Sequence, residues 1–275
     1  MIITTSRNPT SEMVERGLQL SERFSGVYQK RYRRTIHSFL EQSDSVYMVG
    51  KHGRDVLYSA YSDQPLFFHP SMAKVRVQRM LRGELDPLVS ISRLRRGDSF
   101  LDLTLGLGAD SIVAAHVTGE NGSIVGIEKN AYIAEIVARG LTYWQEEVPG
   151  LKAAMQRISV VEGDHLQYLQ KTADNSFDVV YADPMFKNPR LHSNHLAPLR
   201  PFVEEGVMTE TVVKEAKRVA RHAVVLKTER GSLLFSQLGF ESQENHRSIS
   251  YGVIYEKGGC NDEACDRHRG TDSRW

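Results

Sequence analysis

The chain has 275 residues, of which 40% are apolar and 25% are charged, a composition typical of a folded globular protein. No apolar run reaches the roughly 18 residues that a membrane-spanning helix needs, and the first residues lack the apolar core of a signal peptide. With only two cysteines, Cys260 and Cys265, we expect no disulfide framework and a protein of the reducing cytoplasm.

Charge is unevenly distributed along the chain. Residues 1–98 carry a formal charge of +6, whereas the remainder carries −5. A basic segment joined to an acidic body is typical of proteins that bind a polyanion. The alternative, scattered charge on a solvated surface, is equally compatible with the composition.

The first 98 residues predict a small basic α/β lobe. Helical spacing of apolar residues, starting at Ser11, predicts a helix over residues 11–24. A basic segment, residues 30–40, is also expected to be helical, and a second basic helix, residues 71–82, ends at Gly83. The expected strands of this lobe cover residues 2–4, 45–49 and 55–60.

From residue 99 onward, short runs rich in β-branched residues alternate with segments of helical period. This alternation predicts a Rossmann-like α/β domain over residues 99–257, with a seven-stranded, mostly parallel sheet. The last two strands have no helix between them, so we expect an antiparallel pair at the sheet edge, as is usual in methyltransferases. Residues 258–275 are polar, and we expect a disordered tail. The expected strands are 99–103, 123–128, 158–162, 177–182, 223–227, 240–244 and 249–256, and the expected helices are 110–117, 131–144, 165–171 and 211–220.

A strand that runs into a glycine turn and then a helix marks the first candidate site. Gly106 and Gly108 permit backbone angles closed to other residues and allow a ligand close to the main chain. A nicotinamide dinucleotide also fits a glycine turn, but its fingerprint requires Gly or Ala at the position of Ser111. Asp102, near the strand end, would repel a pyrophosphate and attract the cationic methionine part of S-adenosylmethionine. The turn therefore predicts S-adenosylmethionine as the cofactor.

Carboxylates also end the next two expected strands. Glu128 follows the second strand at the position where an acid accepts hydrogen bonds from both ribose hydroxyls. Asp164 follows the third strand, where an acid commonly meets the adenine amino group; the alternative is that it caps the next helix. Because ligands bind at the carboxyl ends of parallel strands, we expect these acids to line one cofactor site.

The fourth expected strand ends in Asp183-Pro184-Met185-Phe186, which resembles the Asp/Asn-Pro-Pro-aromatic motif of amino-group methyltransferases. An exocyclic amine of a base is a poor nucleophile because its lone pair is delocalised into the ring. A carboxylate and a backbone carbonyl that accept its hydrogens favour pyramidalisation and direct the lone pair at the methyl group. Phe186 would stack on the base. The alternative is a strand end with a proline turn and a core phenylalanine.

Together these motifs resemble the RsmJ-type family of small-subunit rRNA guanine-N2 methyltransferases. The resemblance runs in order across most of residues 67–257. Its most specific part is the segment around the tetrapeptide, where Met185 replaces the usual second proline. The segments that carry it are residues 67–74, 102–110, 180–186 and 224–227.

The resemblance implies methylation of guanine N2 by S-adenosylmethionine, with rRNA or the small ribosomal subunit as partner. It implies that Asp183 faces both the cofactor and the acceptor amine. The chain departs from the family at Ala109, usually Arg, at Lys187, usually Pro, and over residues 188–201, which are Pro/His-rich rather than Lys-rich. The other residues that the resemblance places along the cofactor are Ala109, Asp110, Glu128, Lys129, Asp164 and His165.

The second basic helix supplies candidate phosphate ligands. Helical spacing places Arg76, Arg79 and Arg82 along one side, and Lys74 lies two residues before Arg76; these four are expected to bind RNA. Near the C-terminus, Cys260, Cys265 and His268 offer only three ligands at an atypical spacing, and we predict no metal site.

Three hypotheses about function remain open at this point. The first is an RNA amino-methyltransferase, favoured by the intact Asp183 and Phe186. The second is a methyltransferase of another substrate, such as adenine N6, a small molecule or a protein. The third is a ribosome-assembly factor that binds the cofactor but performs no chemistry.

Overall fold

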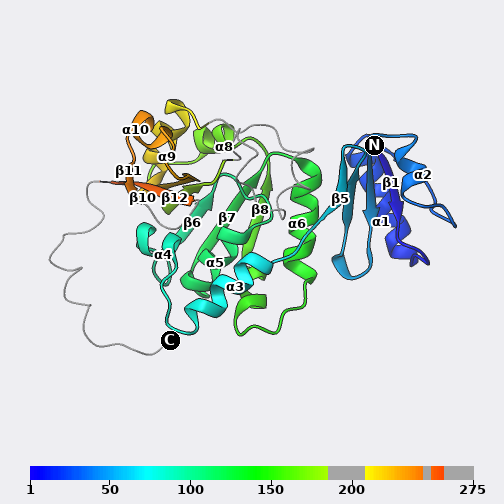
Figure 1. Ribbon diagram of the computed structural model, residues 1–275, viewed down its shortest axis with the longest axis horizontal. Helices are drawn as coiled ribbons and strands as arrows, with labels where there is room; N and C mark the ends of the chain where they lie inside the picture. The colour runs from blue at the N-terminus through cyan, green and yellow to red at the C-terminus, as the bar shows by residue number, and fades with distance from the viewer. Residues whose placement is uncertain (185–207, 244–248, 257–275) are drawn as a thin grey trace.

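The computed structural model describes residues 1–184, 208–243 and 249–256. These residues form a five-stranded sheet at the N-terminal end and a seven-stranded sheet flanked by helices (Figure 1). No helix in these ranges is long and apolar enough to cross a membrane.

Five short strands make up the N-terminal sheet: β1 (Ile2–Thr5), β2 (Val27–Tyr28), β3 (Ser45–Val49), β4 (Val56–Ser59) and β5 (Ser62–Phe67). Their spatial order is β2-β1-β3-β4-β5; β1 runs parallel to β2 and β3, whereas β3, β4 and β5 form an antiparallel meander. Helix α1 (Ser11–Arg23) packs on Ile3 at one face, and the short α2 (His37–Leu40) packs on Ile2 at the other.

One expectation for this region is wrong, and two of its strands, β2 and β5, are not predicted. Of the basic segment 30–40, only α2 is helical, because residues 30–35 offer a helix no apolar face to bury; Tyr32 there is 77% exposed and has a left-handed φ of 46°. Strand β5 is not predicted because Pro65 and its polar neighbours break the alternation of a strand. An edge strand tolerates proline, since one side of it needs no partner.

The larger sheet consists of β6 (Ser99–Asp102), β7 (Ser123–Glu128), β8 (Ile158–Glu162), β9 (Phe177–Ala182), β10 (Ala220–Glu229), β11 (Glu241–Gln243) and β12 (Ile249–Tyr255). The spatial order is β11-β12-β10-β9-β6-β7-β8, so the mostly parallel α/β arrangement is confirmed. β12 pairs antiparallel with both β10 and β11. The expected antiparallel pair is present, but the reversed strand is β12, one position inside the edge that β11 forms.

Alternate side chains of these strands point into two cores on opposite faces of the sheet. The core that contains Phe100 and Tyr181 packs against α3 (Ser71–Met80), α4 (Pro87–Ser92), α5 (Ala109–Thr118), α6 (Ala131–Tyr143) and α7 (Leu151–Gln156). The core that contains Leu101 and Val180 packs against α8 (His165–Lys171), α9 (Glu210–Val219) and α10 (Leu234–Leu238). Helices α4, α7 and α10 escape prediction because segments of five or six residues carry less than two turns of periodicity.

The N-terminal region contacts the larger sheet and its helices through ion pairs and through two helices, α3 and α4, that pack there. Arg16 pairs with Glu135 of α6 at 2.7 Å, and Arg23 pairs with Glu162 at the end of β8 at 2.5 Å. Helices α3 and α4, although within residues 1–98, pack on the larger sheet, α3 against α5 and α4 against β10 and β12. Side chains of α3 can therefore reach the carboxyl ends of the parallel strands.

Candidate functional site

The candidate site lies at the carboxyl ends of β6, β7, β9 and β10. From β6 the chain continues to β7 and β8 on one side and returns to β9 on the other, so the strand order reverses between β6 and β9. Open parallel sheets bind ligands at such a reversal, outside the strand ends. Asp102 ends β6, Asp183 directly follows β9, and the Asp183 N–H donates to Thr104 Oγ1 over 2.6 Å. The glycine turn and the tetrapeptide therefore begin side by side.

The turn after β6 presents main chain to a ligand. Gly106 and Gly108 have φ angles of 50° and 75°, in the left-handed region that glycine adopts at little cost. Gly108 is the N-cap residue of α5 and supplies no capping side chain. The first N–H groups of α5, which begin at Ala109, are thus available to a polar ligand group.

Asp102 is buried at the end of β6, with 2% of its surface exposed. Its Oδ1 accepts the Thr104 N–H at 3.0 Å, and its Oδ2 accepts the Ser111 hydroxyl at 2.7 Å. Burial raises the pKa of Asp102 to about 7, and these two hydrogen bonds offset only part of that effect. Ser111, the residue that departs from the dinucleotide fingerprint, therefore orients a buried acid that a cationic ligand would stabilise in its charged form.

Glu128, the last residue of β7, is held by main-chain donors. Its Oε1 accepts the Asn130 N–H at 2.8 Å, and its Oε2 accepts the Gly106 N–H at 3.1 Å. Burial raises the pKa of Glu128, and the main-chain N–H groups of Asn130, Gly106 and Lys129 offset part of that rise. A carboxylate has about four lone-pair sites, so Glu128 keeps capacity for a further donor, such as a ribose hydroxyl.

Asp164 follows β8 and caps α8. Its Oδ1 accepts the N–H groups of Leu166 at 3.0 Å and Gln167 at 3.1 Å, so the structure shows the capping alternative. Burial lowers the pKa of His165, and the charge of the neighbouring Asp164 offsets part of that effect.

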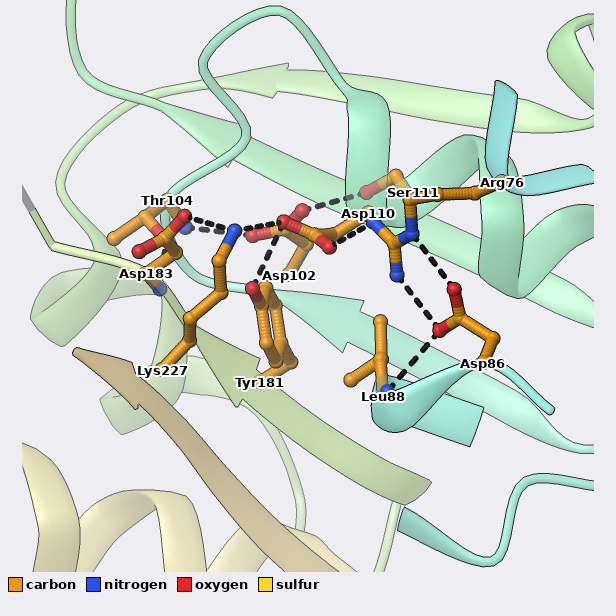
Figure 2. A network of polar contacts seen from close by, with 10 residues as sticks. All are labelled: Arg76, Asp86, Leu88, Asp102, Thr104, Asp110, Ser111, Tyr181, Asp183 and Lys227. Carbon is orange, nitrogen blue, oxygen red and sulfur yellow. Dashed lines mark hydrogen bonds and ion pairs between the residues drawn. The ribbon is translucent and has the colours of Figure 1, made fainter. Parts of the chain in front are cut away.

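A line of charged side chains runs across the site (Figure 2). Lys227, near the carboxyl end of β10, contacts Asp183 Oδ2 at 2.6 Å and Asp110 Oδ2 at 3.0 Å. The Tyr181 hydroxyl donates to the same Asp110 oxygen at 2.8 Å, and Arg76 of α3 binds Asp110 Oδ1 at 2.5 Å. Arg76 also makes two hydrogen bonds of 2.8 Å to Asp86.

The charges in this line determine which groups ionise. Burial opposes the ionisation of Asp110, but the charges of Lys227 and Arg76 outweigh it and hold the pKa of Asp110 below its ordinary value. Burial raises the pKa of Asp183, Asp110 adds to that rise, and Lys227 counteracts it. Burial likewise acts against the charge of Lys227, yet Asp110 and Asp183 hold its pKa well above the ordinary value. The pair of acids and the lysine thus form one electrostatic unit.

These contacts concern two of the residues named from the sequence. Asp110 is engaged by Arg76, Lys227 and Tyr181, so both of its carboxylate oxygens already have partners within the protein. Arg76 points into the protein between two carboxylates, with 16% of its side chain exposed, and, contrary to the expectation, does not share a surface with Arg79 and Arg82. Both arrangements follow from burial, because a charge removed from water requires a partner.

The other expected phosphate ligands lie at the surface. Arg79 and Arg82 share Glu84 and have 47% and 67% of their side chains exposed. Lys74 pairs with Glu146 at 2.8 Å and is 41% exposed. These three cations keep the accessibility that contact with a polyanion requires.

Several expected residues lie outside the described ranges. They are Met185, Phe186, Lys187, residues 188–201, Cys260, Cys265 and His268. Within the ranges that the structure describes, no group of His, Cys, Asp and Glu is arranged to hold a metal ion.

Sequence reasoning missed the supporting roles of Arg76, Tyr181 and Lys227. Lys227 offered a signal, because a lysine that ends a buried apolar strand at the ligand edge must find a carboxylate partner. Arg76 offered none, since its partners Asp86 and Asp110 are 10 and 34 residues away in the sequence.

Comparisons with known proteins agree with this geometry. The family model for SAM-dependent methyltransferases matches residues 67–255. The Bacillus subtilis protein YpiP, whose function is uncharacterised, is 41% identical over 92% of this chain and 98% of its own length. A ribosomal RNA small subunit methyltransferase J from Dechloromonas aromatica is 30% identical over 51% of this chain and 58% of its own length. A crystal structure of a SAM-dependent methyltransferase from Neisseria gonorrhoeae shares the fold, with a TM-score of 0.63 at 17% identity over 95% of this chain and 98% of that one.

The residues present fit S-adenosylmethionine. Asp102 is a buried acid whose charged form a cation would stabilise, Glu128 retains acceptor capacity, and the first N–H groups of α5, after the glycine turn, have no capping side chain. S-adenosylmethionine is accordingly the cofactor of this protein. With its model matched over residues 67–255, the chain belongs to the SAM-dependent methyltransferase family.

Proposed function

We propose that this protein methylates an exocyclic amine of a nucleobase, namely N2 of a guanine in small-subunit rRNA. The observation that carries the proposal is the position of Asp183, whose main-chain N–H donates a hydrogen bond to Thr104 Oγ1 in the glycine turn. Its Oδ2 is held by Lys227, and its Oδ1 makes no hydrogen bond within the described residues. One carboxylate oxygen beside the cofactor turn is therefore available to an N–H donor.

This arrangement suits an amine whose lone pair is delocalised. S-adenosylmethionine supplies an electrophilic methyl group bonded to a sulfonium. Asp183 Oδ1 would accept one amine hydrogen and orient the nitrogen, and it can receive the proton that the nitrogen loses when the N–CH3 bond forms. Pro184, with its fixed φ, limits the freedom of the segment that carries the acceptor. Phe186 would supply the stacking face for the base.

The choice of guanine N2 in rRNA is supported by resemblance and by charge. The tetrapeptide and the segments around it resemble the RsmJ-type pattern, and the partial relative from Dechloromonas aromatica is named as an rRNA small subunit methyltransferase. The basic N-terminal region would supply phosphate contacts, in which Lys74, Arg79 and Arg82 are the exposed candidates.

The test is to digest small-subunit rRNA from cells with and without the gene and to quantify the methylated nucleosides by mass spectrometry. We expect the deletion strain to lack one N2-methylguanosine, and expression of the wild-type gene, but not of Asp183→Asn, to restore it. Loss of an N6-methyladenosine instead would keep the amine chemistry and replace guanine as the substrate. Identical nucleosides in both strains would refute the rRNA assignment.

A further inference from the structure

Five charged side chains at the site alternate in sign along a line. In order they are Asp86, Arg76, Asp110, Lys227 and Asp183, with successive contacts of 2.8, 2.5, 3.0 and 2.6 Å. They come from the N-cap of α4, from α3, from α5, from β10 and from the end of β9. None has more than 28% of its side chain exposed. Water therefore cannot replace these contacts at low cost.

Sheet register brings the last two members together. β9 and β10 run parallel with Ala182 opposite Leu226, so the next residues, Asp183 after the end of β9 and Lys227 within β10, lie side by side. The Lys227 ammonium then lies between Asp183 Oδ2 and Asp110 Oδ2, and Asp110 is itself fixed by Tyr181 and Arg76. This leaves the ammonium little freedom to leave the acceptor carboxylate.

We propose that Lys227 is a positioning residue for methyl transfer: it holds one oxygen of Asp183 so that the other faces the acceptor amine, and Asp110 tunes that hold by sharing the same ammonium. The inference rests on the proposed role of Asp183. Helices α3 and α4 take part as well, because Arg76 of α3 and Asp86 at the N-cap of α4 fix the far end of the line.

Asp183 and Asp110 share the Lys227 ammonium, so removal of either the lysine or the Asp110 charge should shift the pKa of Asp183. A purely structural role of Lys227 would not produce such shifts. Loss of the Lys227 charge leaves Asp183 beside a like charge, so its pKa rises, whereas loss of the Asp110 charge leaves the ammonium to Asp183 alone, so its pKa falls. The other groups that act on Asp183 are Arg76, an attracting cation, and the buried Asp102, Tyr181 and Tyr251. Neither substitution alters these four side chains.

The test is a direct titration of the Asp183 carboxyl carbon by NMR in protein labelled at aspartate, with the signal assigned by its absence in Asp183→Asn. We expect Lys227→Met to raise the pKa of Asp183 by about one pH unit or more, Asp110→Asn to lower it, and Lys227→Arg to leave it near the wild-type value. Lys152→Met removes an exposed lysine that donates a hydrogen bond to Gln145, and it should leave the pKa of Asp183 unchanged. Thermal melting and calorimetry with S-adenosylmethionine verify that each variant is folded.

The second arm is single-turnover methyl transfer to rRNA at saturating S-adenosylmethionine. At pH 7 we expect Lys227→Met to be slowed about tenfold or more, the size of losing a charge-assisted hydrogen bond, with recovery as the pH rises and with rescue by Lys227→Arg. An unchanged Asp183 pKa in Lys227→Met, or a shift in the same direction in Asp110→Asn, would overturn the inference. Absence of transfer by the wild-type protein would instead refute the proposed function, and the titration would still decide the role of Lys227.

Discussion

Replacing Asp102 by asparagine removes a charge from an enclosed position without changing the size of the side chain. Asparagine can still accept the Thr104 N–H, and the Ser111 hydroxyl can still bond its amide group. In the folded protein burial raises the pKa of Asp102 to about 7, against 3.8 for an exposed aspartate. The folded state therefore binds this proton more tightly than the unfolded state does.

The size of the effect follows from that difference. The stabilising contribution of protonated Asp102 is complete at pH values below the unfolded pKa and is lost as the pH rises through about 7. At about 1.4 kcal/mol per pH unit, the loss amounts to roughly 4 kcal/mol by pH 8. Because the asparagine variant has no such loss, its free energy of unfolding should exceed that of the wild type by an amount that grows with pH.

The assay is urea unfolding without cofactor at pH 5, 6, 7 and 8. Asp63→Asn, at an exposed position of β5, serves as the matched control and should show no pH-dependent difference. The asparagine variant should also bind S-adenosylmethionine more weakly, since the charge that attracts the cationic ligand is absent. A stability difference between Asp102→Asn and wild type that stays constant from pH 5 to 8 would refute the burial argument.

Three further predictions concern binding and catalysis. Glu128→Ala should weaken S-adenosylmethionine binding by about 1–3 kcal/mol in calorimetry, because it removes charge-assisted hydrogen bonds; binding of NAD in its place would contradict the site. Asp183→Ala should slow single-turnover methyl transfer about a hundredfold or more at saturating cofactor, the size of losing a preorganised electrostatic contact, and an unchanged rate would remove Asp183 from the chemistry. Neutralising Arg79 and Arg82 together should flatten the dependence of log RNA affinity on log salt by about 1–2; an unchanged slope would leave these residues as ordinary surface charges.

The parallel sheet and the cofactor turn could be predicted because their signals are local. An apolar strand, two glycines and a strand-end acid lie within a few residues, and Asp102 and Gly106 occupy the expected place. The sequence could not show what the neighbours of a charge would be. Arg76 shares a helix with Arg79, yet one points into a pocket of carboxylates and the other into solvent, a difference set by the packing of α3 on α5.

The N-terminal region was less predictable for a related reason. Residues 30–35 have the composition of a basic helix, but a helix persists in a protein when it has an apolar face to bury. For Asp164 the sequence allowed two roles. An aspartate after a strand can cap the next helix or accept a hydrogen bond from a ligand, and the position of Asp164 after β8 agrees with both.

Asp183 is proposed to position an exocyclic amine as the acceptor of the methyl group. The most direct measurement is to incubate the purified protein with unmethylated small-subunit rRNA and S-adenosylmethionine that carries an isotopically labelled methyl group, and then to identify the labelled nucleoside by tandem mass spectrometry. We expect the label on guanine N2 and a loss of about a hundredfold or more in labelling rate with Asp183→Ala. A label on a ring carbon or a ribose oxygen would contradict it, because neither acceptor has amine hydrogens for the carboxylate to receive.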